Sequence, residues 1–176
     1  MFKPFSDNLI FFDTEFSSLD PREGEILSIG MVKMNGEKIY LEIDRPNLKC
    51  SEWVEKNVLP QLTAEKTSIE TAKKKINDFI GDNKPYAISY VNQFDAPYLY
   101  KMISQDELLL HWIILDFASV LFSHGIDPAI ISKENDILYE KLGIDHKKYK
   151  RHNALDDALK LKKLYTKLLE KNEINF

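Results

Sequence analysis

The sequence lacks the features of secreted and membrane proteins. Its 176 residues include a single cysteine, Cys50, which excludes an internal disulfide framework and suits a reducing compartment. No apolar run approaches the ~20 residues that a helix needs to span a bilayer. The first residues, MFKPFSDN, lack the basic and then apolar layout of a signal peptide. We therefore expect a cytoplasmic protein with no membrane partner.

The chain also lacks an excess of positive charge. It has 24 Lys and Arg against 28 Asp and Glu, which gives a formal net charge of −4. A nucleic-acid partner would therefore be bound locally, through a metal site and a few basic side chains, and not by a broad basic surface. Hydrophobic residues make up 44% of the sequence, which is ordinary for a globular protein, and we expect one domain over residues 1–176.

The apolar periodicity predicts an alternation of strands and helices. Strands are expected at 9–16, 26–34, 38–44, 84–91 and within 111–117. Helices are expected from Ser51 to Pro60, over 68–80, from near Asp95, over 117–125, over 136–143 and over 154–171. A hairpin-rich start followed by strand–helix crossovers predicts an α/β protein with a ribonuclease H-like fold: a mixed five-stranded sheet with helices on both faces.

Two acids interrupt the first strand, LIFFDTEF. Its first four residues leave no polar face, as in a central strand that is covered on both sides. Asp13 and Glu15 are two positions apart, so their carboxylates point the same way, ~7 Å apart along the strand. Two desolvated carboxylates repel each other, and a divalent metal would compensate for the repulsion. The alternative is a strand that ends in water, with both acids in a solvated loop.

A further acid lies on the apolar side of the last helix. At helical spacing Asp157 shares a stripe with Leu161, Leu164 and Leu168, whereas its neighbour Asp156 shares one with Lys160, Lys163 and Lys167. We therefore expect Asp157 to face the core and Asp156 to face water. A metal would explain the inward acid. The alternative is an acid that the helix dipole stabilises. This explains why Asp157 lies in the first turn of the helix but not why it lies on the apolar side.

Other candidates are weaker when each is taken alone. His152 precedes the last helix and could act as a general base near neutral pH, or it is a surface histidine in a basic loop. Asp95 lies where a strand turns into a helix, where either a helix cap or a ligand site is expected. Asp116 is interpreted as a cap, and the three other histidines, His111, His124 and His146, as surface residues without catalytic roles.

Taken together, three segments resemble the motifs of the DEDDh 3′–5′ exonucleases, the family of RNase T and oligoribonuclease. FFDTEF matches the first motif with Asp13 and Glu15, YVNQFDAPYL the second with Asp95, and HNALDDA the third with His152 and Asp157. The resemblance covers about residues 9–168. The segment WVEKNVLPQL is similar to a small exoribonuclease branch that acts on RNA 3′ ends.

The resemblance implies a function and a site. Asp13, Glu15, Asp95 and Asp157 would hold two divalent cations, Mg²⁺ or Mn²⁺, with His152 as general base. RNA would be hydrolysed from its 3′ end to nucleoside 5′-monophosphates. The alternatives are a 3′–5′ DNA exonuclease of the repair or proofreading type and a catalytically inactive nucleic-acid-binding domain. Small members of the family are often homodimers, so a homodimer is expected by analogy.

Contacts to the substrate are expected beside this site. Phe16 follows the carboxylate pair and is a candidate for stacking on a terminal base, with core packing as the alternative. Arg22 and the basic residues from His146 to Arg151 are candidates for phosphate contacts, with a solvated loop as the alternative for the second group.

Overall fold

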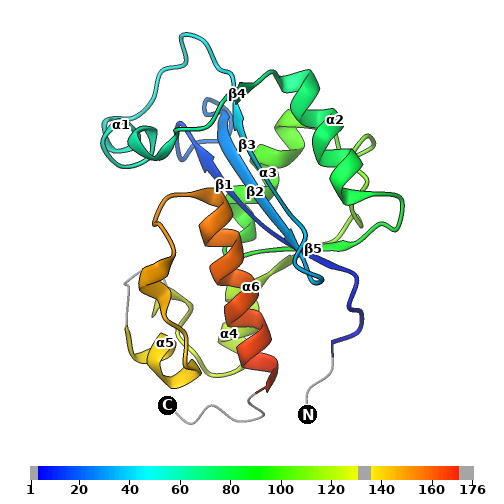
Figure 1. Ribbon diagram of the computed structural model, residues 1–176, viewed down its shortest axis with the longest axis vertical. Coiled ribbons are helices and arrows are strands. Elements are labelled where there is room, and N and C mark those ends of the chain that lie inside the picture. The colour runs from blue at the N-terminus through cyan, green and yellow to red at the C-terminus, as the bar shows by residue number, and fades with distance from the viewer. Residues whose placement is uncertain (1–3, 131–135, 171–176) are drawn as a thin grey trace.

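A mixed sheet of six strands forms the centre of the molecule (Figure 1). The computed structural model describes residues 4–130 and 136–170. The strand order is β4-β3-β2-β1-β5-β6, with β1 antiparallel to β2 and parallel to β5. The bounds are β1 Leu9–Phe16, β2 Ile26–Lys33, β3 Lys38–Ile43, β4 Lys66–Thr67, β5 Tyr86–Ser89 and β6 Ile114–Asp116. The sequence predicted five strands. The sixth, β4, has two residues, too few for an apolar alternation to reveal it.

The helices fall close to their predicted positions. Their bounds are α1 Glu52–Asn57, α2 Ile69–Ile80, α3 Asn92–Met102, α4 Phe117–Ser123, α5 Asp136–Leu142 and α6 Ala154–Glu170, with 3₁₀ turns at Leu59–Gln61, Pro128–Ile130 and His146–Lys148. The last predicted helical residue, Lys171, lies outside the described residues.

Helix α3 begins three residues before Asp95, where the sequence placed its start. The reason is a cap from a distant strand: the backbone N–H of Asn92 donates to Oδ1 of Asp116 at 3.0 Å. The other oxygen of Asp116 accepts from the N–H of Ser119 at 2.8 Å and caps α4, which confirms the predicted cap. A local pattern cannot show that one carboxylate caps two helices.

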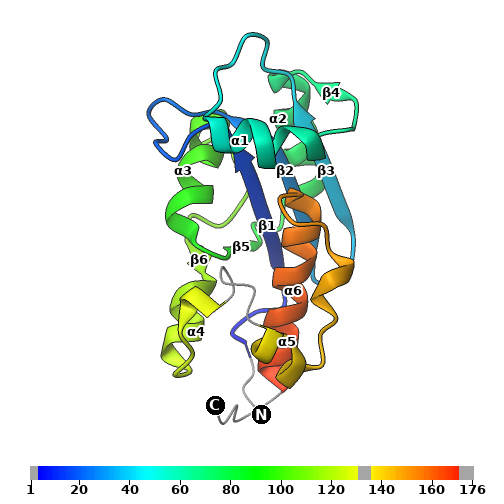
Figure 2. The same cartoon turned by 90° about the vertical axis from the view of Figure 1, so that its left-hand side faces the viewer.

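Helices cover both faces of the sheet, as expected (Figures 1 and 2). Ile10 and Phe12 pack toward α2 and α3, whereas Leu9 and Phe11 pack toward α4, α5 and α6. Successive strand side chains point to opposite faces, so Asp13 and Glu15 continue the face that carries Leu9 and Phe11. The two acids therefore point to the side of the sheet on which α6 lies.

Helix α6 approaches the sheet most closely at Gly30. A Cβ atom built on Gly30 would lie 2.3 Å from the backbone nitrogen of Leu155 and 2.4 Å from the carbonyl of Ala154. Gly30 pairs with Asp13 across β1 and β2, so the start of α6 lies over the acid-bearing part of β1. A glycine inside a strand often marks such an approach of another backbone.

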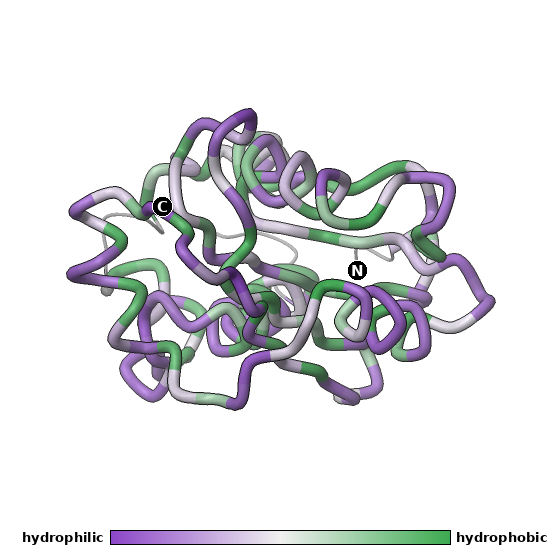
Figure 3. The backbone as a smooth tube through the Cα atoms, turned by 90° about the horizontal axis from the view of Figure 1, so that it is seen from above, coloured by the Kyte–Doolittle hydropathy of each residue, from purple (hydrophilic) through white to green (hydrophobic). Residues whose placement is uncertain are grey.

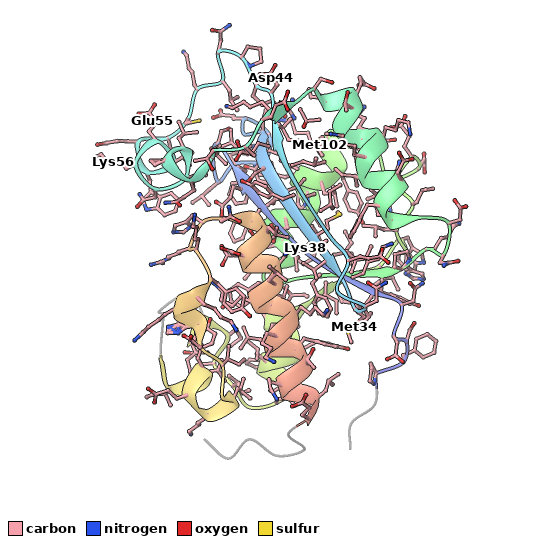
Figure 4. All side chains as sticks on the ribbon, in the orientation of Figure 1. Met34, Lys38, Asp44, Glu55, Lys56 and Met102 are labelled. Atoms are coloured by element: carbon pink, nitrogen blue, oxygen red, sulfur yellow. The ribbon has the colours of Figure 1, made fainter. Side chains whose placement is uncertain are left out.

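The hydropathy of the chain follows this layering. Hydrophilic segments occupy many of the outer loops in Figure 3, and Figure 4 shows Glu55 and Lys56 of α1 pointing away from the body of the protein. Met102, the last residue of α3 and labelled in Figure 4, is buried in a core cluster with residues of the sheet. Within residues 4–130 and 136–170, no helix combines the length and the apolar character that crossing a membrane requires.

Candidate metal centre

Three of the predicted carboxylates meet where β1 passes under the start of α6. Asp13, Glu15 and Asp157 each present an oxygen, and these oxygens all lie within 4.8 Å of one another. Glu15 is only 9% exposed. Further along α6, Leu161, Leu164 and Leu168 are buried against the same face of the sheet. The stripe on α6 and the alternation on β1 therefore bring these three acids together, as the sequence predicted.

The fourth acid, Asp95, belongs to the first turn of α3 and contacts the end of β1. Its Oδ1 accepts from both the backbone N–H and the hydroxyl of Thr14, at 2.9 Å and 2.7 Å. Thr14 can make this contact because β1 pairs with β5 only as far as Phe11, so the backbone of Thr14 is not used in that pairing. Asp95 is 6% exposed and lines the same cleft, but it is not part of the group within 4.8 Å. Thr14 thus orients Asp95 beside the other three acids.

Burial and mutual repulsion make these carboxyl groups weak acids. Desolvation is the main cause of the raised pKa of Glu15, about 8, and the charges of Asp157 and Asp95 add to it. Desolvation also raises the pKa of Asp95 to about 7, although the hydrogen bonds from Thr14 oppose it. The pKa of Asp13 is raised well above its usual range, first by burial and then by Asp95, Asp157 and Glu15. Such a group of acids favours the binding of positive charge.

Lys160 supplies positive charge at this place, contrary to the sequence interpretation. Its ammonium pairs with Oδ1 of Asp157, and its side chain is 19% exposed, so it does not belong to the water-facing stripe. An acid and a lysine three positions apart can meet on a helix, which was the available signal. Asp156 is half-buried rather than free in water: its Oδ2 accepts from the backbone N–H of Lys150 at 2.8 Å. Asp156 is absent from the lining of the cleft.

His152 lines the same cleft and lies two residues before Ala154, the first residue of α6. Its backbone is in the left-handed region, with φ of 56°, which is uncommon for a residue other than glycine. The imidazole meets the indole of Trp53 edge to face, with ring centroids 4.9 Å apart. Trp53 was predicted only as one of the apolar residues of its helix, yet it is 53% exposed.

The cleft around these residues has a volume of about 730 Å³. Its lining includes the four acids together with aromatic and basic side chains. Phe16 lines it and also stacks on Tyr98 at 4.4 Å between ring centroids, so it has both a packing contact and a face toward the cleft. Leu19 and Phe94, which the sequence did not single out, line it as well.

The basic candidates divide into two groups. Lys147 and Arg151 line the cleft, together with His146, which the sequence interpretation had given no catalytic role but had included in the candidate phosphate-contact segment. Arg22 does not line it, and its guanidinium pairs with Asp20 at 2.6 Å in the loop after β1. The structure thus brings part of the 146–151 segment to the acids and leaves Arg22 outside.

The carboxylate set fits a divalent cation. Carboxylate oxygens are the ligands that hard cations such as Mg²⁺ and Mn²⁺ prefer. The closeness of Asp13, Glu15 and Asp157 would be costly for three charged groups alone, and a cation offsets that cost. The four acids and His152 line one cleft, so a bound cation, a general base and a substrate could meet there.

Metal binding should depend strongly on pH. Glu15 and Asp95 have folded-state pKa values of about 8 and about 7, above their ordinary values of 4.5 and 3.8. The folded state therefore retains protons that the unfolded state has lost, and without metal these groups reduce stability as pH rises from near 4 toward 8. A cation requires the deprotonated acids, so it restores more stability at high pH.

We expect Mg²⁺ to raise the unfolding temperature more at about pH 8 than at about pH 5.5, relative to EDTA at each pH. Thermal unfolding in the two media measures this difference. An equal Mg²⁺-induced shift at both pH values would contradict the assignment of the raised pKa values to metal-binding groups.

Comparison with known proteins supports this interpretation of the cleft. No curated protein of similar sequence was found. Among solved structures, the fold is similar to that of E. coli exonuclease I in its zinc-bound complex with single-stranded DNA, with a TM-score of 0.61 and 13% identity over 92% of this chain. This chain spans 39% of the length of that exonuclease I chain. The likeness shows the expected ribonuclease H-like fold.

The family is shown by the sequence itself. The family model described as RNase_T, exonuclease, matches residues 10–165, which is most of the chain and includes all four acids and His152. The matched segment runs from β1 into α6, the two elements that bring Asp13, Glu15 and Asp157 together. The protein therefore belongs to the RNase T exonuclease family, the DEDDh 3′–5′ exonucleases.

Proposed function

We propose that this protein is a metal-dependent 3′–5′ exoribonuclease that removes nucleoside 5′-monophosphates from single-stranded RNA or 3′ overhangs. The observation that carries the proposal is the cluster of Asp13, Glu15 and Asp157 within 4.8 Å, in one cleft with Asp95 and His152. Membership of an exonuclease family supports the same reaction class. The catalytic residues we propose are Asp13, Glu15, Asp95, Asp157 and His152.

The acids would hold two divalent cations, Mg²⁺ or Mn²⁺. When bound, such ions activate a water molecule and stabilise the charge on a leaving oxygen. Asp13 belongs to the group within 4.8 Å and lines the same cleft as Asp95, and we propose that it would contribute to both ions. Glu15 and Asp157 would complete one set of ligands, and Asp95 would serve the other, partly through water.

His152 would accept the proton of the attacking water. An imidazole with an ordinary pKa near 6.5 changes charge in the neutral range, which suits a general base. It lines the cleft on the loop that leads into α6, where it would lie beside a phosphate held near the four acids. Phe16 would stack on the terminal base, and such stacking accepts any of the bases.

The choice of RNA rests on the segment WVEKNVLPQL, which is similar to the exoribonuclease branch. DNA is the second candidate, and a specific observation favours it: the structurally similar exonuclease I was solved with single-stranded DNA. Recognition of RNA would require contacts to the 2′-hydroxyl, for which the sequence shows no motif.

One assay distinguishes these candidates. The protein is incubated with 5′-labelled single-stranded RNA, DNA of matching sequence, and an RNA duplex with a 3′ overhang, with Mg²⁺, Mn²⁺ or EDTA. We expect a stepwise ladder from the RNA substrates that EDTA abolishes. A ladder mainly from DNA would support the second candidate, and no ladder with either metal would overturn the exonuclease proposal.

A further inference from the structure

We propose that Trp53 is a positioning residue that sets the orientation of the His152 imidazole for proton transfer. This inference rests on the proposed function, in which His152 is the general base. Its first support is the edge-to-face contact, with ring centroids 4.9 Å apart and ring planes at 89°. Aromatic rings favour this arrangement because the positive edge of one ring meets the negative face of the other.

Packing of the fold does not require an aromatic ring at position 53. Helix α1 is held by Val54 and by Val58, the residue that follows its last turn; they are 5% and 1% exposed and pack with Leu27 of β2. Trp53 itself is 53% exposed, although it is the largest side chain of the helix. The indole instead contacts the imidazole of His152, which lines the cleft.

Helix α1 is fixed to the strand that carries the acids. The N–H of Ser51 donates to the carbonyl of Ser17, just beyond β1, at 3.1 Å. The hydroxyl of Ser51 accepts from the N–H of Val54 and caps the helix. These two hydrogen bonds fix the start of α1, and with it Trp53, relative to the strand that carries Asp13 and Glu15.

The far end of this segment is tied to the sheet as well. The N–H groups of Thr63 and Ala64 donate to Oε1 of Glu42, at 2.8 Å and 2.9 Å. Glu42 is 1% exposed on β3, so this anchor is shielded from water. The segment from Ser51 to Ala64 is thus attached at both ends to the sheet that forms the floor of the site.

His152, in contrast, belongs to a connection between a 3₁₀ turn and α6. Its left-handed backbone conformation places the side chain outside the helix, where intrahelical packing cannot fix its two side-chain torsions. A rigid indole against the imidazole restricts those torsions. Because proton transfer needs a well-placed base, loss of this contact should slow the chemical step and leave substrate binding nearly unchanged.

A double-mutant cycle on the whole protein tests the inference. The variants are Trp53→Ala, Trp53→Phe, His152→Asn and the Trp53→Ala/His152→Asn pair. Asparagine suits position 152 because it tolerates the left-handed backbone. Trp112→Ala is the matched control: Trp112 is also exposed and stacks on a histidine, but that histidine, His111, does not line the cleft, whereas His152 does.

We expect Trp53→Ala to lower kcat roughly tenfold with little change in KM, and Trp53→Phe to restore most of kcat. In the His152→Asn background, Trp53→Ala should cause no further loss, because its effect acts through the imidazole. Trp112→Ala should match the wild type. An equal loss from Trp53→Ala in both backgrounds, or a loss confined to KM, would overturn the positioning role and indicate direct contact with substrate.

A second measurement does not depend on activity. In a Trp112→Phe protein, Trp53 is the only tryptophan of the chain, and a contacting imidazole quenches indole fluorescence. We expect His152→Asn to increase this emission, and unchanged emission would overturn the contact. A wild type that degrades none of the labelled substrates would overturn the proposed function, and with it a catalytic role for the contact, whatever the emission shows.

Discussion

Asp157→Asn is expected to reduce exonuclease activity by roughly 10³-fold or more, whereas Asp156→Asn should stay within a few-fold of the wild type. Asp157 is one of the three acids whose oxygens lie within 4.8 Å, so the amide replaces one of the three carboxyl groups of that cluster with a neutral and weaker metal ligand. The side chain keeps its size, so the loss reports charge and ligand character and not packing.

Asp156→Asn is the matched control on the adjacent residue. Its carboxylate accepts a hydrogen bond from Lys150, and an asparagine oxygen can accept the same bond. Cleavage of labelled RNA measures activity, and calorimetric titration with Mn²⁺ measures metal binding. Equal losses in the two variants would contradict the assignment of Asp157 to the inward face of α6 and Asp156 to the loop contact.

Gly30→Ala is expected to destabilise the fold by ~3 kcal/mol and to weaken metal binding at the same time. The added methyl group would lie 2.3 Å from the nitrogen of Leu155 and 2.4 Å from the carbonyl of Ala154. Both neighbours are backbone atoms, which cannot rotate away as a flexible side chain would, so the start of α6 must move off the sheet. Asp157 moves with it and leaves Asp13 and Glu15.

Urea unfolding and Mn²⁺ titration measure the two effects, and Gly36→Ala is the control. Gly36 has no atom within 4 Å of a built Cβ, but its φ of 97° strains any other residue. We expect Gly36→Ala to cost ~1 kcal/mol through the backbone alone and to leave metal affinity intact. A Gly30→Ala protein with wild-type stability and metal affinity would refute the role of this close approach.

Much of the site was predictable because its signals are local. The alternation in LIFFDTEF assigns Asp13 and Glu15 to one face of a buried strand, and the 3.6-residue period of the last helix assigns Asp157 to its apolar side. Each inference needs only the few residues around it. The motif spacing then indicated the family, which the family match over residues 10–165 confirms.

Other features depend on residues that are far apart in the chain. Asp116 caps α3 across 24 positions and moves its start to Asn92. Thr14 orients Asp95 across 81 positions. No periodic pattern carries this information, because the partners meet only after the sheet has formed.

Local periodicity thus determined which side of its own element each acid occupies, since strand and helix geometry are set by the backbone. Only the tertiary structure decided how close those elements come. Gly30 allows α6 to approach the sheet closely, and the indole of Trp53 contacts the imidazole of His152. These contacts join β2 to α6 and α1 to the loop before α6. They follow from packing between elements, which residue spacing within one element does not encode.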